Sequence, residues 1–240
     1  HEEEVDHPEL TEEARSWFAR IEKGDPEAQA LFQFFKDITL ADVKEIYDRL
    51  HVTFDSWNGE AFFNDKMDEP LKMLEQKGLI TESQGAKIVD LSAYDMPPCL
   101  LVKSDGSSLY ATRDIAAAIW RKKEYDFDKC LYVVAYQQNL HFKQFFKVLE
   151  LAGFPWAKDL VHVAYGMVSL EDGAMSTRKG NVVLLRDVIN KAVAKADEII
   201  AAKNPDLANR SQVAEQVGRC CFPLSKTQKS RILPSLSIAF

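Results

Sequence analysis

The chain has 240 residues, of which 46% are hydrophobic and 28% are charged, and its formal net charge is −7. These values are typical of a globular protein with one large or two small domains. An acidic chain lacks the overall positive field that drives nonspecific binding to nucleic acid, so any such contact has to be local. No apolar run approaches the ~18 residues of a membrane-spanning helix, so we expect no membrane contact.

The four cysteines Cys99, Cys130, Cys220 and Cys221 show no CxxC spacing. We therefore expect reduced thiols in a cytoplasmic protein. The chain begins at His1 without a signal-peptide pattern, and we expect a processed chain or an excised piece.

The first fifty residues are predicted to be helical. Apolar residues at helical spacing predict one helix that begins near Pro8 and ends at Gly24. A second helix is expected to restart at residues 25–26, where Pro takes the first helical position, and a third from Thr39 to about Leu50.

Residues 51–104 are predicted to mix helix and strand. Residues 51–54 alternate like a strand, and residues 68–77 are expected to form a helix. Further strands are expected at residues 86–91 and 100–103.

The central element of the prediction is the apolar and aromatic run at residues 131–136, which predicts a strand buried on both faces of a parallel sheet. A helix follows, with Asn139 as its expected cap, and then a strand near residues 159–168. This order predicts a right-handed crossover. Open α/β sheets bind ligands at the carboxyl ends of their strands, here at residues 137–141.

Tyr110 and Asp114 would share one face of a helix that includes both. A carboxylate beside a phenol suits a cationic ligand, and a guanidinium offers paired donors that match a carboxylate. Alternatively, Asp114 pairs at the surface with Arg113 or with a neighbouring lysine. The residues leave both interpretations open.

Gln138 and His141 stand where a pocket is expected. The amide can position a substrate and the imidazole can meet a phosphate, or else the segment is only a helix cap and a solvent-facing loop. His162, in the middle of a predicted strand, is expected to be a packed, hydrogen-bonded core residue.

Residues 173–181 form a polar loop with flanking glycines, two hydroxyls and the adjacent cations Arg178 and Lys179. Such a loop can bring N–H groups and positive charge to phosphate oxygens, although it lacks the Walker A pattern. Alternatively, it is only a polar loop.

Together, four blocks in order and spacing resemble the arginyl-tRNA synthetase family over roughly residues 1–216. The blocks are Asp105-Gly-Ser-Ser-Leu-Tyr-Ala-Thr-Arg-Asp114, Tyr132-Val-Val-Ala-Tyr-Gln-Gln-Asn-Leu-His141, Trp156-Ala-Lys-Asp-Leu-Val-His-Val-Ala-Tyr-Gly-Met-Val168 and Met175-Ser-Thr-Arg-Lys-Gly-Asn-Val182. The resemblance implies an α/β fold, the second half of a Rossmann-like class I synthetase catalytic domain with a mainly helical inserted region.

The same resemblance implies four segments. Residues 1–50 are a helical part of the inserted region, and residues 51–104 are a mixed α/β inserted layer. Residues 105–203 are the second half of the nucleotide-binding fold, and residues 204–240 are a helical connection toward a C-terminal domain. Within that connection, residues 219–223 and 233–240 depart from the family pattern.

The implied activity is that of an arginine–tRNA ligase, which activates L-arginine with ATP and transfers it to tRNA(Arg). The residues that match the family's arginine site are Tyr110, Asp114 and Gln138. The residues that match its ATP site are His141, Met167, Val168 and Met175. The residues that match its mobile catalytic loop, named KMSKS, are Met175, Ser176, Arg178 and Lys179. Ala174 and Thr177 stand where that loop carries lysines, so Arg178 and Lys179, or a cation elsewhere, are expected to supply the charge.

The implied partners are L-arginine, ATP with Mg²⁺, and tRNA(Arg), with a monomeric full-length enzyme and no metal site of the protein's own. No His-x-Gly-His motif of the family's first catalytic half occurs in the chain. We therefore expect that the chain alone makes no arginyl-adenylate. The alternative is a non-catalytic module that binds arginine or tRNA.

Overall fold

The computed structural model of the protein describes residues 6–104, 106–166, 169–170, 173–174 and 183–227. The chain divides into two compact units. One comprises His1–Asp55 with Val168–Phe240, and the other comprises Ser56–Met167. The four segments predicted from the sequence remain a prediction.

The strands of the unit formed by residues 56–167 make two small sheets. An antiparallel sheet has the order β1-β2-β3, and a parallel sheet pairs β4 with β5 from Cys130 opposite Leu160 to Ala135 opposite Tyr165. The bounds of these strands are β1 Thr81–Ser83, β2 Ala86–Val89, β3 Cys99–Val102, β4 Cys130–Ala135 and β5 Leu160–Tyr165. The predicted strands at residues 86–91, 100–103 and 159–168 are thereby confirmed.

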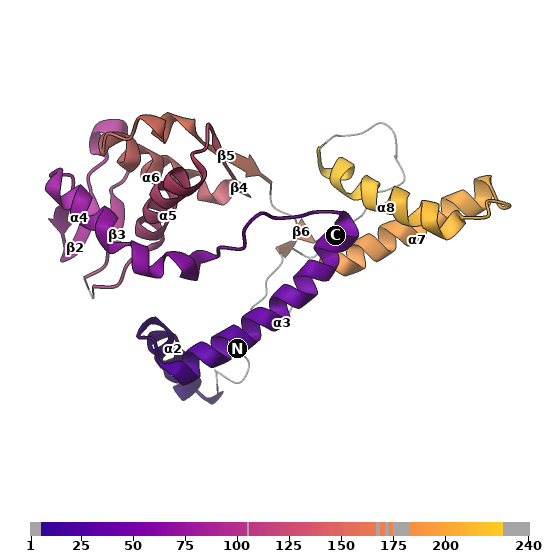
Figure 1. The fold of residues 1–240 in the computed structure, drawn as a ribbon, viewed down its shortest axis with the longest axis horizontal. Coiled ribbons are helices and arrows are strands. Elements are labelled where there is room, and N and C mark those ends of the chain that lie inside the picture. The colour runs from indigo at the N-terminus through magenta and orange to yellow at the C-terminus, as the bar shows by residue number, and fades with distance from the viewer. Residues whose placement is uncertain (1–5, 105, 167–168, 171–172, 175–182, 228–240) are drawn as a thin grey trace. The chain divides into compact units, whose positions relative to one another are not determined.

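In the described residues of this unit, three α-helices and several short 3₁₀ helices complete the fold. Their bounds are η1 Glu60–Lys66, α4 Asp68–Gln76, η2 Ser92–Tyr94, α5 Tyr110–Tyr125, η3 Tyr136–Gln138, α6 Asn139–Leu151 and η4 Pro155–Asp159. Figure 1 shows α5 and α6 beside the β4–β5 pair. The chain order β4-α6-β5 with parallel strands confirms the predicted crossover unit, which is typical of α/β folds.

One hydrophobic core joins the helices and both sheets of this unit. Its largest fully buried side chains include Phe145 and Leu149 of α6, Ile115 of α5, Leu101 of β3 and Leu74 of α4. Because α5 and α6 meet in this core, their first turns are held at a fixed place relative to the end of β4.

The prediction that the central strand is buried on both faces is wrong. Tyr132 packs against the aromatic rings of α6, but Leu131 and Val133 are 57% and 64% exposed. Val163, which pairs with Val133 across the parallel ladder, is also exposed. Successive residues of a strand point to opposite faces, so one face of β4–β5 carries the core contacts and the other is open in the described part of the unit.

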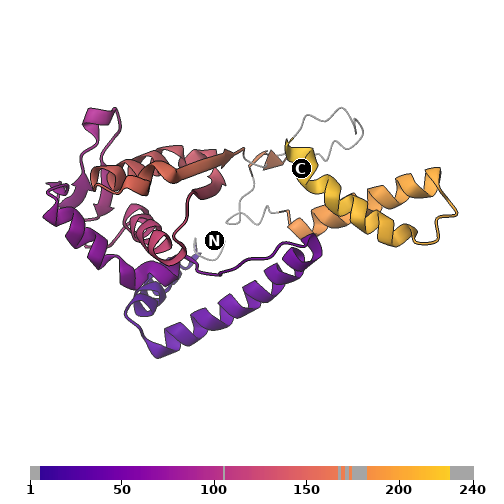
Figure 2. The same cartoon turned by 45° about the horizontal axis from the view of Figure 1, so that its top comes forward.

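The other unit is mainly helical. Its elements are α2 Glu9–Glu22, α3 Pro26–Leu50, β6 Ser169–Leu170, β7 Gly173–Ala174, α7 Leu185–Lys203 and α8 Arg210–Thr227. Asp25 caps α3 by accepting a hydrogen bond from the N–H of Ala28, and Pro26 takes the first helical position as predicted. Figures 1 and 2 show α7 and α8 side by side as a helical hairpin.

Two sequence predictions fail at α3. The helix predicted to start at Thr39 is the continuation of α3, and the Thr39 hydroxyl donates to the carbonyl of Phe35 inside it. The strand predicted at residues 51–54 does not form. His51 ends α3 in the left-handed conformation with φ of 56°, and its N–H bonds Asp48 of the last helical turn.

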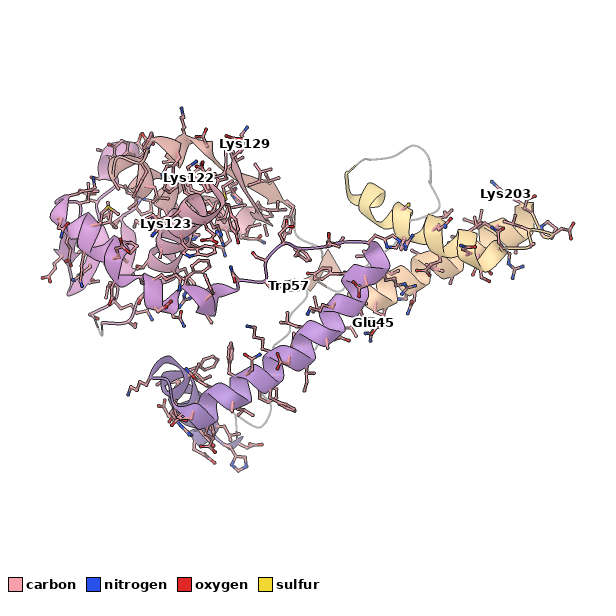
Figure 3. The ribbon with its side chains drawn as sticks, viewed as in Figure 1. Glu45, Trp57, Lys122, Lys123, Lys129 and Lys203 are labelled. Carbon is pink, nitrogen blue, oxygen red and sulfur yellow. The ribbon has the colours of Figure 1, made fainter. Side chains whose placement is uncertain are left out.

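Ion pairs tie α3 to both α7 and α8. Arg49 bonds Glu215 of α8 through two nitrogens, at 2.7 and 3.0 Å, and bonds Asn190 of α7 at 2.7 Å. Arg186 of α7 bonds Asp42 at 2.6 Å and Glu45 at 3.2 Å. Glu45 lies toward the C-terminal end of α3 in Figure 3. These bonds fix the end of α3 within its unit.

None of the helices in the described ranges is long and apolar enough to cross a membrane. Cys99 is buried in the core, and burial raises the pKa of its thiol to about 12, which disfavours the reactive thiolate. Cys99, Cys130 and Cys220 are free thiols.

Candidate functional site

The start of α5 is fixed by its contact with β3. The buried hydroxyl of Thr112 donates to the carbonyl of Leu101 at 2.6 Å, and the N–H of Leu109 donates to the same carbonyl at 3.0 Å. Tyr110 is the first residue of α5, and Asp114 lies one turn later on the same face. Tyr110 is 69% exposed as a residue and the Asp114 side chain is 35% exposed, so both can meet a ligand.

The second half of the site begins where β4 ends. The chain passes from Ala135 through the short helix η3 into α6, with Gln138 at the N-cap position. Asn139, the predicted cap, is already helical, and the helix has no side-chain cap bond. Gln138 is exposed, and His141 follows it in the first turn of α6.

A single bond joins these two helix starts. His141 Nε2 lies 2.6 Å from Asp114 Oδ2. A carboxylate only accepts hydrogen bonds, so Nε2 is the donor. Gln138 lies three residues before His141, and residues at this spacing are neighbours on a helix face. The structure thus brings Asp114 and His141 into contact and places Tyr110 and Gln138 within one helical turn of that pair.

The sequence did not predict the bond between Asp114 and His141. It offered Arg113 as a surface partner of Asp114, but Arg113 instead bonds Glu60 at 3.0 Å. The position of Gln138 and His141 after the predicted central strand indicated that they lie where a pocket is expected. No pattern in the sequence indicated that the start of α6 meets α5, because this contact depends on core packing.

The His141 side chain packs against a group of aromatic rings. The His141 ring lies 5.4 Å from Phe142 and 5.3 Å from Phe145, measured between ring centroids, and its side chain is 22% exposed. His162 stacks on Phe142 at 4.1 Å, and its Nε2 lies 2.9 Å from the carbonyl oxygen of Val134. His162 is therefore the packed, hydrogen-bonded residue that was predicted.

Tyr132 belongs to the same group of aromatic rings. Its ring lies 5.2 Å from Phe142 and 5.6 Å from Phe145. Burial is the main cause that raises the pKa of the Tyr132 phenol, so this hydroxyl stays neutral at physiological pH. Tyr132 therefore contributes no charge to this group of rings.

The remaining predicted site residues lie outside the described residues. They are Met167, Val168, Met175, Ser176, Arg178 and Lys179. Their predicted roles at ATP and in the catalytic loop stay predictions.

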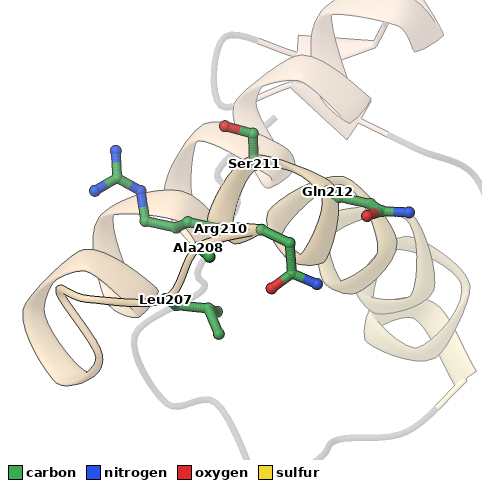
Figure 4. Close-up of a pocket in the computed structure, with 6 residues that line it drawn as sticks. Leu207, Ala208, Arg210, Ser211 and Gln212 are labelled. Carbon is green, nitrogen blue, oxygen red and sulfur yellow. The ribbon is translucent and has the colours of Figure 1, made fainter.

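A separate hollow lies in the helical unit, at the turn from α7 into α8, and is lined by residues 207–212. Lys203 lies at the end of α7 near this turn in Figure 3. Figure 4 shows the side chains of Arg210, Ser211 and Gln212 spreading in different directions. Arg210 bonds Asp197 at 2.9 Å. The lining groups do not converge on one point, so the hollow does not resemble a site for a small molecule.

In the described ranges, no group of three or more His, Cys, Asp or Glu side chains is placed to hold a metal ion. Among the described residues, the candidate site consists of one carboxylate, one imidazole, one phenol and one amide. Such a set matches a ligand with several N–H donors and positive charge.

The chain is similar to known proteins over most of its length. Residues 1–234 match the family described as tRNA synthetases class I (R), catalytic domain. The chain is 54% identical over 232 residues to an arginine–tRNA ligase of Clostridioides difficile, covering 97% of this chain and 41% of the relative. It is 55% identical over 232 residues to an arginine–tRNA ligase of Halothermothrix orenii, again covering 97% of this chain and 41% of the relative. The chain thus spans about two fifths of the length of these curated relatives.

Solved structures share the fold. A crystal structure of the arginyl-tRNA synthetase from Plasmodium falciparum superposes with a TM-score of 0.75 at 18% identity, covering 91% of this chain and 37% of that one. The arginyl-tRNA synthetase of Thermus thermophilus superposes with a TM-score of 0.60 at 22% identity, covering 82% and 42%. The mixed helix and sheet arrangement of this chain is that of these structures.

Proposed function

The chain belongs to the family of class I (R) tRNA synthetase catalytic domains, and from this premise we propose that it is part of an ATP-dependent arginine–tRNA ligase. The proposed activity belongs to the natural protein that contains the chain. In the first step the carboxylate of L-arginine attacks the α-phosphate of ATP, which forms arginyl-adenylate and releases pyrophosphate. In the second step the arginyl group passes to a terminal hydroxyl of tRNA(Arg), which releases AMP.

Asp114 is the proposed partner of the guanidinium of arginine, with Tyr110 and Gln138 beside it. The observation that carries this proposal is the bond of 2.6 Å between Asp114 and His141, because it joins α5, one turn after its start, to the first turn of α6. A carboxylate that is part exposed there can pair with a guanidinium through two parallel hydrogen bonds. The phenol and the amide add polar groups within one turn on either side.

This arrangement would also explain the selection of arginine over other amino acids. A neutral or shorter side chain would leave the Asp114 carboxylate without its charged partner once the bound ligand covers it. Leaving a charged group unpaired is costly, so a site built to bond its substrate rejects analogues that lack the bonding group. No separate editing step is needed for such a site.

The proposed roles of the other residues follow the family resemblance. Met175, Ser176, Arg178 and Lys179 would belong to the family's catalytic loop, which steadies the leaving pyrophosphate through positioning and charge. His141, Met167, Val168 and Met175 are the residues predicted beside ATP. Mg²⁺ would arrive with ATP and offset phosphate charge. We assign it no ligand among the described residues.

The proposed partners of the natural protein are L-arginine, ATP and tRNA(Arg), in a monomeric enzyme of the cytoplasm. The proposed segments are those of the sequence analysis, with residues 105–203 as the half of the catalytic fold that carries the arginine site.

The test is Asp114→Asn in the natural protein, measured by arginine-dependent ATP–pyrophosphate exchange. Loss of a charged hydrogen-bonding partner costs about 1.5–3 kcal/mol, so we expect the KM for arginine to rise by roughly 10- to 100-fold. The KM for ATP should change by less than about twofold. Asp128→Asn, at an exposed aspartate of the same unit, is the matched control and should change neither constant.

Equal losses for arginine and ATP in Asp114→Asn would contradict the role assigned to Asp114. Arginine binding by the natural protein with no adenylate formed would favour the alternative function, a binding module without catalysis.

A further inference from the structure

We propose that His141 is a positioning residue that holds the Asp114 carboxylate in the orientation needed to receive a guanidinium. This inference rests on the proposed function, since it assigns His141 a role at the arginine site. It differs from the ATP-binding role that the family resemblance gives His141. The two roles predict different kinetic losses when His141 is replaced.

The contact that carries the proposal is direct. His141 Nε2 lies 2.6 Å from Asp114 Oδ2, a short distance typical of a hydrogen bond to a charged acceptor. Within the described part of the chain, His141 is the hydrogen-bond partner of the Asp114 side chain, since the adjacent Arg113 bonds Glu60 instead. The orientation of this carboxylate is therefore set by the imidazole.

The imidazole is itself held in place. Its ring contacts Phe142 and Phe145 at centroid separations of 5.4 and 5.3 Å, and Phe145 is fully buried in the core. The His141 side chain is 22% exposed, whereas the Asp114 side chain is 35% exposed. The donor of the bond is thus packed against the core, and the acceptor is the more exposed member that is available to a ligand.

The bond leaves enough acceptor capacity for a guanidinium. An ionised carboxylate offers about four lone-pair sites on its two oxygens, and His141 occupies one of them. A guanidinium that binds through two parallel N–H bonds needs one further site on each oxygen. One carboxylate can therefore accept from the imidazole and from the substrate together.

Pre-orientation of this kind improves binding because less side-chain freedom remains to be lost when the ligand arrives. Without the bond, Asp114 can rotate among several rotamers at the start of α5, of which only some present both oxygens to the site. Removing His141 should therefore weaken arginine use and leave the nucleotide steps intact.

The test uses three variants of the natural protein in arginine-dependent ATP–pyrophosphate exchange. His141→Leu removes the donor, His141→Gln retains an N–H donor of similar reach, and His141→Asn retains polarity with a shorter reach. His7→Leu, at an exposed histidine of the other unit, is the matched control. Thermal unfolding of each variant, followed by circular dichroism, shows whether it is folded.

We expect His141→Leu and His141→Asn to raise the KM for arginine by roughly tenfold, the loss typical of one charged hydrogen bond. The KM for ATP should stay within about twofold of the wild-type value. His141→Gln should recover most of the lost arginine affinity, which a merely structural role would not predict. If His141→Leu fails to fold, the comparison of the Asn and Gln variants decides the matter.

A double-mutant cycle separates this proposal from the proposed function. If His141 acts through Asp114, His141→Asn should have little further effect on the KM for arginine in the Asp114→Asn background.

A normal KM for arginine in Asp114→Asn alone would instead overturn the proposed function. A large effect of Asp114→Asn with no effect of His141→Asn on the KM for arginine would overturn only the positioning role. A rise in the KM for ATP with an unchanged KM for arginine would also overturn it, in favour of an ATP-binding role.

Discussion

Arg49 shows what one residue contributes to the helical unit. Its guanidinium bonds both oxygens of Glu215 and the side chain of Asn190, so it links three helices. The hydrogen bond from Arg49 is the main cause that lowers the pKa of Glu215. A carboxylate with a lowered pKa stabilises the fold above its unfolded pKa, and this contribution is lost as the pH falls through the folded pKa.

We predict that Glu215→Gln lowers the free energy of unfolding by about 1 kcal/mol or less at neutral pH, because the pair is partly exposed to solvent. The difference from wild type should shrink as the pH falls below the ordinary glutamate pKa of about 4.3, since wild type then loses the same charge. Chemical denaturation across this pH range is the measurement. Glu13→Gln, at an exposed glutamate of α2, is the control. A difference that stays constant down to low pH would contradict the assignment.

At the candidate site, the sequence predicted the kind of ligand and its place but not the contact between two of the residues. The residue types of Tyr110 and Asp114 suited a cationic ligand, and the end of the central strand indicated where a pocket, with Gln138, was expected. The partner of Asp114 could not be predicted, because His141 is distant in the chain and reaches Asp114 only when α5 and α6 pack on one core.

At the scale of elements, the α7–α8 hairpin depends on a close approach of two helices. An added Cβ on Gly218 of α8 would lie 2.6 Å from the Cα of Val193 in α7, which is too short for any real contact. The absence of a side chain at Gly218 is therefore what lets the two helices approach.

We predict that Gly218→Ala destabilises the protein. Alanine gains about 1 kcal/mol in helix propensity, but the clash is with backbone atoms and overpacking of this kind costs about 1–3 kcal/mol. The midpoint of thermal unfolding should fall, and amide exchange in α7 and α8 should accelerate. Gly59→Ala, where an added Cβ meets no atom within 4 Å, is the control. A stabilised Gly218→Ala would show that the helices are not in this contact.

Elements were predicted well where local chemistry decides them and poorly where it does not. Asp25 and Pro26 marked the start of α3, and Gly24, with φ of 79°, marked the end of the helix before it. The alternation at residues 51–54 resembled a strand, but these residues pair with no strand in the described part of the unit. Period-two alternation predicts a strand only when a partner strand is present.

At the scale of the whole molecule, the predicted α/β fold and the resemblance to arginyl-tRNA synthetases are both confirmed. The predicted burial of the central strand on both faces is wrong. The described residues of the unit cover only one face of the strand, and Leu131 and Val133 lie on the other. A run of apolar residues indicates that a strand is covered on both faces. It does not indicate which segment covers each face.

The central claim is that Asp114 and Gln138 belong to one binding site for a guanidinium. The most direct measurement is a crystal structure of the natural protein with L-arginine bound. We predict guanidinium nitrogens about 3 Å from the Asp114 carboxylate, with the Gln138 side chain in contact with the same molecule. Arginine bound away from Asp114, or Gln138 facing a different cavity, would contradict the account.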